Sequence, residues 1–145
     1  MKSTFLIVAM AAGLLTLTAQ AEPAGAGPNK GKLVGQAPDL AEAVISADGI
    51  LTVTFLDADN KPAAPGARTV SVFAQLDAGR QPVEMVAKDG AFISASPLPK
   101  PEGYILVVQI RASADAKPIN TRIPFAMHIC GGCQLPEYAC TCTDH

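Results

Sequence analysis

Cysteine and histidine are absent from residues 1–127 of this 145-residue chain. All four cysteines and both histidines lie in the final segment, HICGGCQLPEYACTCTDH. Any chemistry that needs a thiol or an imidazole is therefore confined to residues 128–145. The chain also lacks a G-x-S-x-G turn, the usual nucleophile motif of serine hydrolases. We predict that the protein is not an enzyme.

A stripe of basic side chains and a long internal apolar run are missing as well. The chain has 11 Lys and Arg against 13 Asp and Glu, and the two signs are interspersed. This pattern predicts no nucleic-acid partner. Beyond the first segment, no apolar run approaches the roughly 20 residues that a membrane-spanning helix needs, so we do not expect an integral membrane protein.

The first 21 residues have the order of a secretory signal peptide. Lys2 supplies the positive charge, residues 5–17 form the apolar stretch, and Ala19–Ala21 is a small-residue cleavage site. The apolar stretch is shorter than the roughly 20 residues of a membrane anchor. We expect cleavage after Ala21 and a periplasmic or secreted protein.

Residues 22–39 are rich in proline, glycine and alanine and show no useful periodicity. We predict a flexible lead-in here, with one short strand near Lys32 to Gly35. The following segment, residues 38–45, is the one helical candidate. It is short, and it fits the start of the first strand of a sheet equally well.

Strand patterns dominate the chain from residue 40 onward. Val, Ile, Thr and Phe recur in short runs, separated by clusters of turn-forming residues. These runs are residues 49–58, 68–76, 82–88, 91–96, 103–112 and 119–127. The spacing predicts an all-β fold, an immunoglobulin-like β-sandwich of about seven strands over residues 40–127. The candidate core residues are Leu51, Val53, Phe55, Val70, Val72, Val86, Ile93, Ile105, Val107 and Ile123.

Three stretches of this region carry a resemblance to a known family. They are DGILTVTFLDADNKPAAPGARTVSV, a KDGAFISA turn and a GYILVVQI strand. Together they resemble the exported immunoglobulin-like domains of bacterial heavy-metal handling systems, the YtkA-like and CopC-like kind. The resemblance covers about residues 40–127 and implies a fold more than an activity, because one sandwich serves many functions. CopC-like copper sites use a histidine at the mature amino terminus, where this chain has Glu22.

The tail, residues 128–145, contains two pairs of cysteines. Cys130 and Cys133 flank two glycines, which let the backbone turn so that both sulfurs face one centre. Cys140 and Cys142 are one residue apart, so in an extended segment both side chains project to the same side. Two sulfurs from each pair predict a tetrahedral site for Zn(II) or Cu(I), the metals that suit soft ligands.

His128 and His145 are the remaining candidate ligands. Either imidazole could replace one thiolate, and Met127 adds a thioether of the kind that Cu(I) accepts. Disulfides need no histidine, so the presence of both histidines beside the cysteines favours a metal.

Two other interpretations of the cysteines stay open. An exported protein with four cysteines is expected to form disulfides, because its compartment oxidises thiols. Cys130 with Cys140 and Cys133 with Cys142, or Cys130 with Cys142 and Cys133 with Cys140, would staple the tail into a hairpin. Thiol–disulfide exchange at Cys130 and Cys133 is the third interpretation, although nothing here begins a helix that would lower the thiol pKa.

The sequence thus predicts a small periplasmic metal-binding protein that binds, senses or delivers Cu(I) or Zn(II) through its tail. Its expected partners are a metal ion and an envelope efflux or assembly protein. The alternative is a non-catalytic structural or interaction domain of the envelope with a disulfide-stapled tail.

Overall fold

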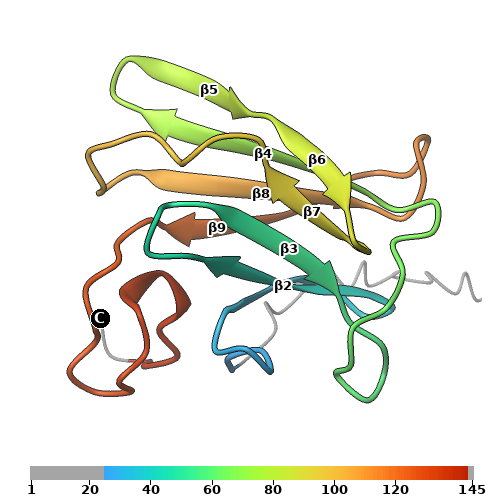
Figure 1. Ribbon diagram of the computed structural model, residues 1–145, viewed down its shortest axis with the longest axis horizontal. Coiled ribbons are helices and arrows are strands. Elements are labelled where there is room, and N and C mark those ends of the chain that lie inside the picture. Colours follow the sequence, from blue (N-terminus) through green and yellow to red (C-terminus); the bar gives the residue numbers. More distant parts are fainter. Residues whose placement is uncertain (1–24, 144–145) are drawn as a thin grey trace, which may run out of the picture.

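The computed structural model describes residues 25–143, so the predicted signal peptide, Glu22 and His145 lie outside the described residues. Within this range the chain forms nine strands and one 3-10 helix, η1 (Glu137–Ala139) (Figure 1). The strands are β1 (Lys32–Gln36), β2 (Asp39–Ile45), β3 (Leu51–Phe55), β4 (Thr69–Leu76), β5 (Gly79–Val83), β6 (Met85–Lys88), β7 (Ala91–Ser94), β8 (Ile105–Arg111) and β9 (Ile119–Pro124). No helix in the described part of the chain is long and apolar enough to span a membrane.

The strands form two antiparallel sheets packed as a sandwich. One sheet has the order β1-β2-β3-β7-β6, and the other has the order β5-β4-β8-β9. If β2 to β9 are lettered A, B, C, C′, D, E, F and G, these sheets are A-B-E-D with β1 added at its edge, and C′-C-F-G. This is the immunoglobulin strand order, so the predicted fold class is confirmed.

The structure decides one segment that the sequence left open and corrects another. Residues 38–45, which fitted either a helix or the start of a strand, are mostly strand β2, because they lie between β1 and β3 and bury alternate side chains against the core. The run 82–88, predicted as one strand, is divided at Glu84 between β5 in one sheet and β6 in the other. The strand expected near residues 32–35 is β1, so the sandwich begins within the predicted lead-in.

The core lies between the two sheets. Six of the candidate core residues are buried there, namely Leu51, Val53, Phe55, Val70, Val72 and Ile123. Val86 is instead 46% exposed, and Ile93 and Ile105 are partly exposed. On β8 the side chains that face the other sheet are Leu106, Val108 and Ile110, because side chains alternate along a strand. Ile105 and Val107 take the opposite face, where Val107 is nevertheless buried at 8% exposure.

A tyrosine corner fixes the connection into β8. The Tyr104 hydroxyl donates a hydrogen bond to the Pro99 carbonyl oxygen at 2.8 Å, and the Tyr104 ring packs on Phe125 with centroids 5.2 Å apart. A tyrosine near the start of strand F that bonds back to the chain is a hallmark of immunoglobulin-like domains. Burial, and secondarily the charge of Glu102, raises the pKa of Tyr104 to about 12, so this donor stays protonated.

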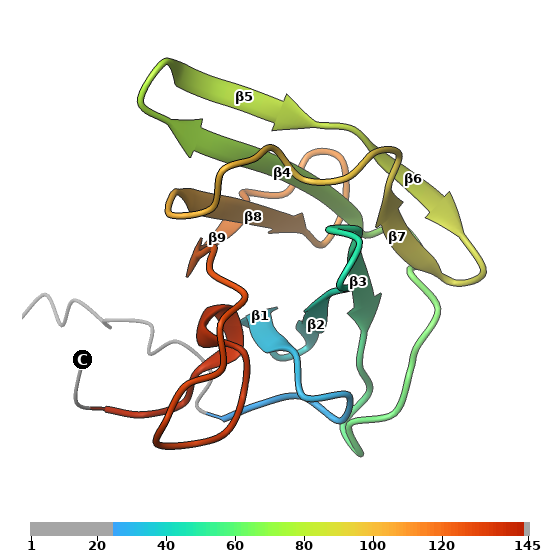
Figure 2. The ribbon, with the colours of Figure 1, turned by 60° about the vertical axis from the view of Figure 1, so that its left-hand side comes forward.

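The tail packs against the side of the sandwich where β1 and β9 approach each other. Figure 2 shows η1 and its flanking loops beside β1, below the end of β9. The main contacts of η1 are with these same two strands. The tail is therefore attached to the domain through η1.

Candidate metal centre

A tight turn carries the first pair of cysteines. Residues 129 and 136 form an isolated bridge, and inside it the Cys130 N–H donates to the Leu135 carbonyl at 2.8 Å. The Gln134 N–H donates back to the Cys130 carbonyl at 3.0 Å, and Gln134 has a left-handed φ of 60°. The chain therefore reverses directly after Cys133, which brings the turn with both sulfurs back toward η1.

The second pair follows η1 in an extended segment. At Cys140 the backbone has φ −56° and ψ 138°, so the chain leaves the helix in an extended conformation. The Cys142 N–H then donates to the Cys140 sulfur at 3.4 Å. Both sulfurs lie within 4.8 Å of the two sulfurs of the Cys130 turn.

The four sulfurs form one compact group. All lie within 4.8 Å of one another. The Sγ–Sγ distances are 3.4 Å for Cys130 to Cys140, 3.6 Å for Cys133 to Cys140 and 3.8 Å for Cys130 to Cys142. A tetrahedral ion with Zn–S bonds of about 2.3 Å requires sulfurs about 3.8 Å apart. No pair among these four residues is at the disulfide length of about 2.0 Å.

Backbone amides favour the thiolate form of the first pair. The N–H groups of Cys133 and Gly132 point at the Cys130 sulfur and lower its pKa. The N–H groups of Thr141 and Leu135 do the same for Cys133, whose pKa falls to about 6. The turn and the Thr141 amide of the second half thus supply to both sulfurs the hydrogen bonds that stabilise a thiolate or a metal-bound sulfur.

The second pair shows the opposite shift. The Cys142 N–H lowers the pKa of Cys140, but burial and the neighbouring sulfurs of Cys130 and Cys133 outweigh it and raise this pKa to about 12. The Cys140 thiol lowers the pKa of Cys142, yet the Cys130 and Cys133 sulfurs raise it overall. Four thiolates this close repel one another, and a bound cation removes that repulsion.

Gly132 provides the space in which the two pairs meet. A Cβ atom at this position would lie 2.8 Å from the Cys142 sulfur and 3.8 Å from the Cys130 sulfur. A Cβ atom at Gly131 would meet nothing within 4 Å. Only the second glycine of the C-G-G-C turn is therefore required for the approach of the two halves.

Tyr138 anchors the tail to the sandwich. Its hydroxyl accepts a hydrogen bond from the Ile45 N–H at 3.0 Å, and its own N–H donates to the Ala126 carbonyl at 3.0 Å. Tyr138 and Ala139 are 3% and 0% exposed, and both belong to the hydrophobic core. Burial is the main cause of the raised pKa of Tyr138, with the charge of Glu42 adding to it. The Tyr138 ring therefore points into the sandwich.

The other predicted ligands are placed differently from the cysteines. The group of side chains close enough to share an ion, within residues 25–143, consists of the four cysteines and does not include His128. The His128 side chain is 70% exposed, and its Nε2 lies 3.7 Å from Glu137 Oε2. Met127 packs against the core. His145 is outside the described residues.

Gly132 and Tyr138 have roles that the sequence does not show. The C-G-G-C spacing indicates that glycines are needed, but the choice between Gly131 and Gly132 depends on where Cys142 lies. The role of Tyr138 depends on the end of β2, which is far away in the sequence. Neither position carries a local signal for its role.

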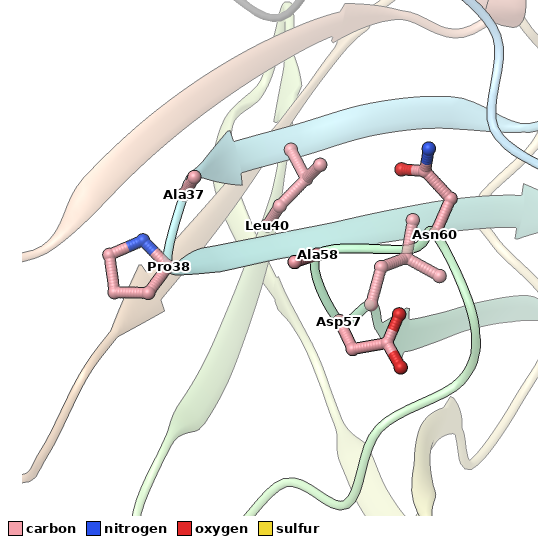
Figure 3. A pocket seen from close by; sticks show the side chains of 7 residues that line it. Ala37, Pro38, Leu40, Asp57, Ala58 and Asn60 are labelled. Atoms are coloured by element: carbon pink, nitrogen blue, oxygen red, sulfur yellow. The ribbon is translucent and has the colours of Figure 1, made fainter.

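A pocket of about 470 Å³ lies between the β1–β2 turn and the loop after β3 (Figure 3). Pro38, Leu40 and Leu56 contribute apolar surface to it. Its one carboxylate, Asp57, accepts hydrogen bonds from the backbone N–H groups of Asp59 and Lys61, both at 2.9 Å. Asp57 therefore organises its own turn, as expected for a connection between strands.

No family model, curated protein or solved structure matches this chain. The assignment of the centre therefore depends on the geometry of the four thiols.

Proposed function

We propose that this chain is a small exported, non-catalytic metal-binding protein whose tail holds one Zn(II) ion through Cys130, Cys133, Cys140 and Cys142. The observation that carries the proposal is the spacing of the sulfurs, 3.4 to 3.8 Å for the three closest pairs. These distances are close to the edge of a ZnS₄ tetrahedron, about 3.8 Å, and far from the S–S bond of about 2.0 Å.

Zn(II) fits this donor set better than Cu(I). Four thiolates carry four negative charges, of which Zn(II) cancels two and Cu(I) only one. Cys130 is 5% exposed and the other three cysteines are partly buried, so the charge left over is costly. Four sulfurs in a tetrahedral arrangement are also the usual environment of zinc in proteins.

The ion would order the tail, while the sandwich has a core of its own. Nineteen buried residues form one cluster between the sheets, and only Tyr138 and Ala139 come from the cysteine segment. Binding to a four-cysteine site contributes on the order of 10 kcal/mol of folding free energy in small zinc domains. We infer that here this energy holds the tail against the sandwich.

The signal-like sequence at residues 1–21 and the resemblance to exported domains of heavy-metal systems support a role in the cell envelope. A protein that binds a metal ion and delivers it to an efflux or assembly protein would fit both the signal-like sequence and the resemblance. Cys133, Cys140 and Cys142 are only partly buried, so an acceptor can reach this side of the centre, which also fits delivery.

The test is native mass spectrometry of the protein exported with its own leader and purified without reductant. We expect one zinc per chain, and four thiols that react with an alkylating reagent only after a chelator is added. A variant with all four cysteines changed to serine is the control and should carry no metal. Two complete disulfides and no metal in the exported protein would contradict the proposal and favour the stapled tail.

A further inference from the structure

The four-stranded sheet is positively charged, although the chain as a whole has a net charge of −2. Strands β4, β5, β8 and β9 contain three arginines and no aspartate or glutamate. The arginines are Arg80, Arg111 and Arg122, three of the four in the chain. The sequence gives no sign of this charge, because the three residues are far apart along the chain.

Strand register brings these arginines to the outer face of the sheet. Along β4 the buried residues Val72 and Ala74 face the core, so Phe73 and Gln75 face outward. Arg122 pairs with Val107, which pairs with Phe73. Arg80 pairs with Gln75, and Arg111 pairs with Thr69 at the far end of the same face. We call this surface the arginine face.

Each guanidinium on the arginine face is held by a neutral partner. Arg80 lies over the Phe73 ring at 3.6 Å from its centroid. Arg122 Nη2 donates to Gln75 Oε1 at 2.8 Å, and Arg111 Nη1 donates to the Ala116 carbonyl at 2.7 Å. Across residues 25–143 the one ion pair is between His128 and Glu137, so the three arginine charges are not neutralised by a carboxylate.

We propose that the arginine face binds an acidic segment of a partner protein. Arginine and aromatic side chains are enriched in protein–protein interfaces, whereas lysine is depleted, and these four strands contain no lysine. Arg80 and Arg122 are already oriented by Phe73 and Gln75, so little side-chain freedom is lost when they bind carboxylates. Three charges on a flat sheet give only weak attraction to an anionic membrane.

The geometry suggests how such a segment would lie. Arg111 is four residues along β8 from Val107, the partner of Arg122, so the positions of Arg122 and Arg111 are about 13 Å apart along the strands. In an extended peptide every second side chain points to the same side, and residues four positions apart are also separated by about 13 Å. A strand-like segment with alternating glutamates would therefore reach both Arg122 and Arg111.

The probe for the test is a dye-labelled ten-residue peptide that alternates glutamate and serine, compared with its glutamine counterpart. Fluorescence anisotropy with the full mature protein should show binding of the glutamate peptide that weakens as salt is added. R80Q/R122Q should lower the affinity by about tenfold or more, since charge-assisted bonds to two arginines are lost. The matched variant K61Q/K88Q removes two exposed charges outside the face and should bind within about twofold of the unchanged protein.

R111Q should also lower the affinity for the glutamate peptide, and it is the variant to measure if R80Q/R122Q does not fold. Equal binding of the two peptides, or equal loss in K61Q/K88Q, would overturn the proposal. Vesicles of phosphatidylglycerol and phosphatidylcholine provide the last comparison. Arginine-dependent binding to vesicles without binding of the glutamate peptide would assign the face to a lipid surface instead. None of these outcomes depends on whether the protein contains zinc.

Discussion

Replacing Gly132 by alanine tests the geometry of the proposed metal centre most directly. The new Cβ atom would lie 2.8 Å from the Cys142 sulfur, where ordinary van der Waals contact begins at 3.4 Å. The sulfur or the turn must therefore move by about 0.6 Å, the difference between these two distances. Metal–ligand distances in proteins vary by only about 0.2 Å, so the displacement is too large for the fourth ligand to stay in place.

The expected loss of affinity follows from that displacement. Removing a partner that merely orients a ligand weakens metal binding by about 10- to 100-fold. Displacing a ligand itself should cost at least as much, so we expect G132A to bind Zn(II) about 100-fold more weakly. Thermal unfolding of the metal-free protein should change little, because Gly132 is exposed and lies outside the core.

Competition with a chromophoric chelator measures the zinc affinity of the two glycine variants side by side. G131A is the control, since its Cβ atom would meet nothing within 4 Å and it should bind zinc like the unchanged protein. If G132A binds zinc within about twofold of the unchanged protein, or if G131A loses as much affinity, the placement of Cys142 against this turn is wrong.

Three further predictions concern the hydrogen bond of Tyr138, the release of protons on zinc binding, and the packing of β8 in the core. Tyr138→Phe leaves a β2 amide without its acceptor and should lower the unfolding free energy of the zinc-bound protein by about 1–3 kcal/mol, measured by urea titration. Zinc binding at neutral pH should release protons, because the pKa of Cys140 is raised to about 12 while that of Cys133 is lowered to about 6. Calorimetry in buffers of different ionisation enthalpy should show this release. The zinc affinity should also fall as the pH is lowered, because protons compete with zinc for the thiolates. An affinity that rises toward acid pH would refute a thiolate site. Ile110→Ala should cost about 2–5 kcal/mol in thermal or urea unfolding, whereas Ile105→Ala on the outer face of β8 should cost clearly less, and equal losses would mean that the faces of β8 are misassigned.

Local patterns were sufficient to predict the fold class and the grouping of the cysteines. Alternating Val, Ile and Thr with regular turns specify strands, and four cysteines in two closely spaced pairs need only one reversal of the chain to meet. That reversal occurs at Gln134, directly after Cys133.

Features that depend on register or on distant contacts could not be predicted. Strand β8 is apolar on both faces for most of its length, so its sequence does not show that Leu106 rather than Ile105 faces the core. The run 82–88 reads as one strand because nothing local marks the change of sheet at Glu84. The arginine face needs the register of four strands, which no short segment encodes.

The Tyr138 hydroxyl also has a consequence for association between molecules. Strand β1 pairs with β2 only as far as Ala43, so Val44 and Ile45 extend beyond their neighbour at the edge of the sheet. An uncovered strand edge is a place where two sandwiches can join through backbone hydrogen bonds and aggregate. By accepting the Ile45 N–H, the tail occupies a donor at this edge, so that group is not available to pair with a second sandwich.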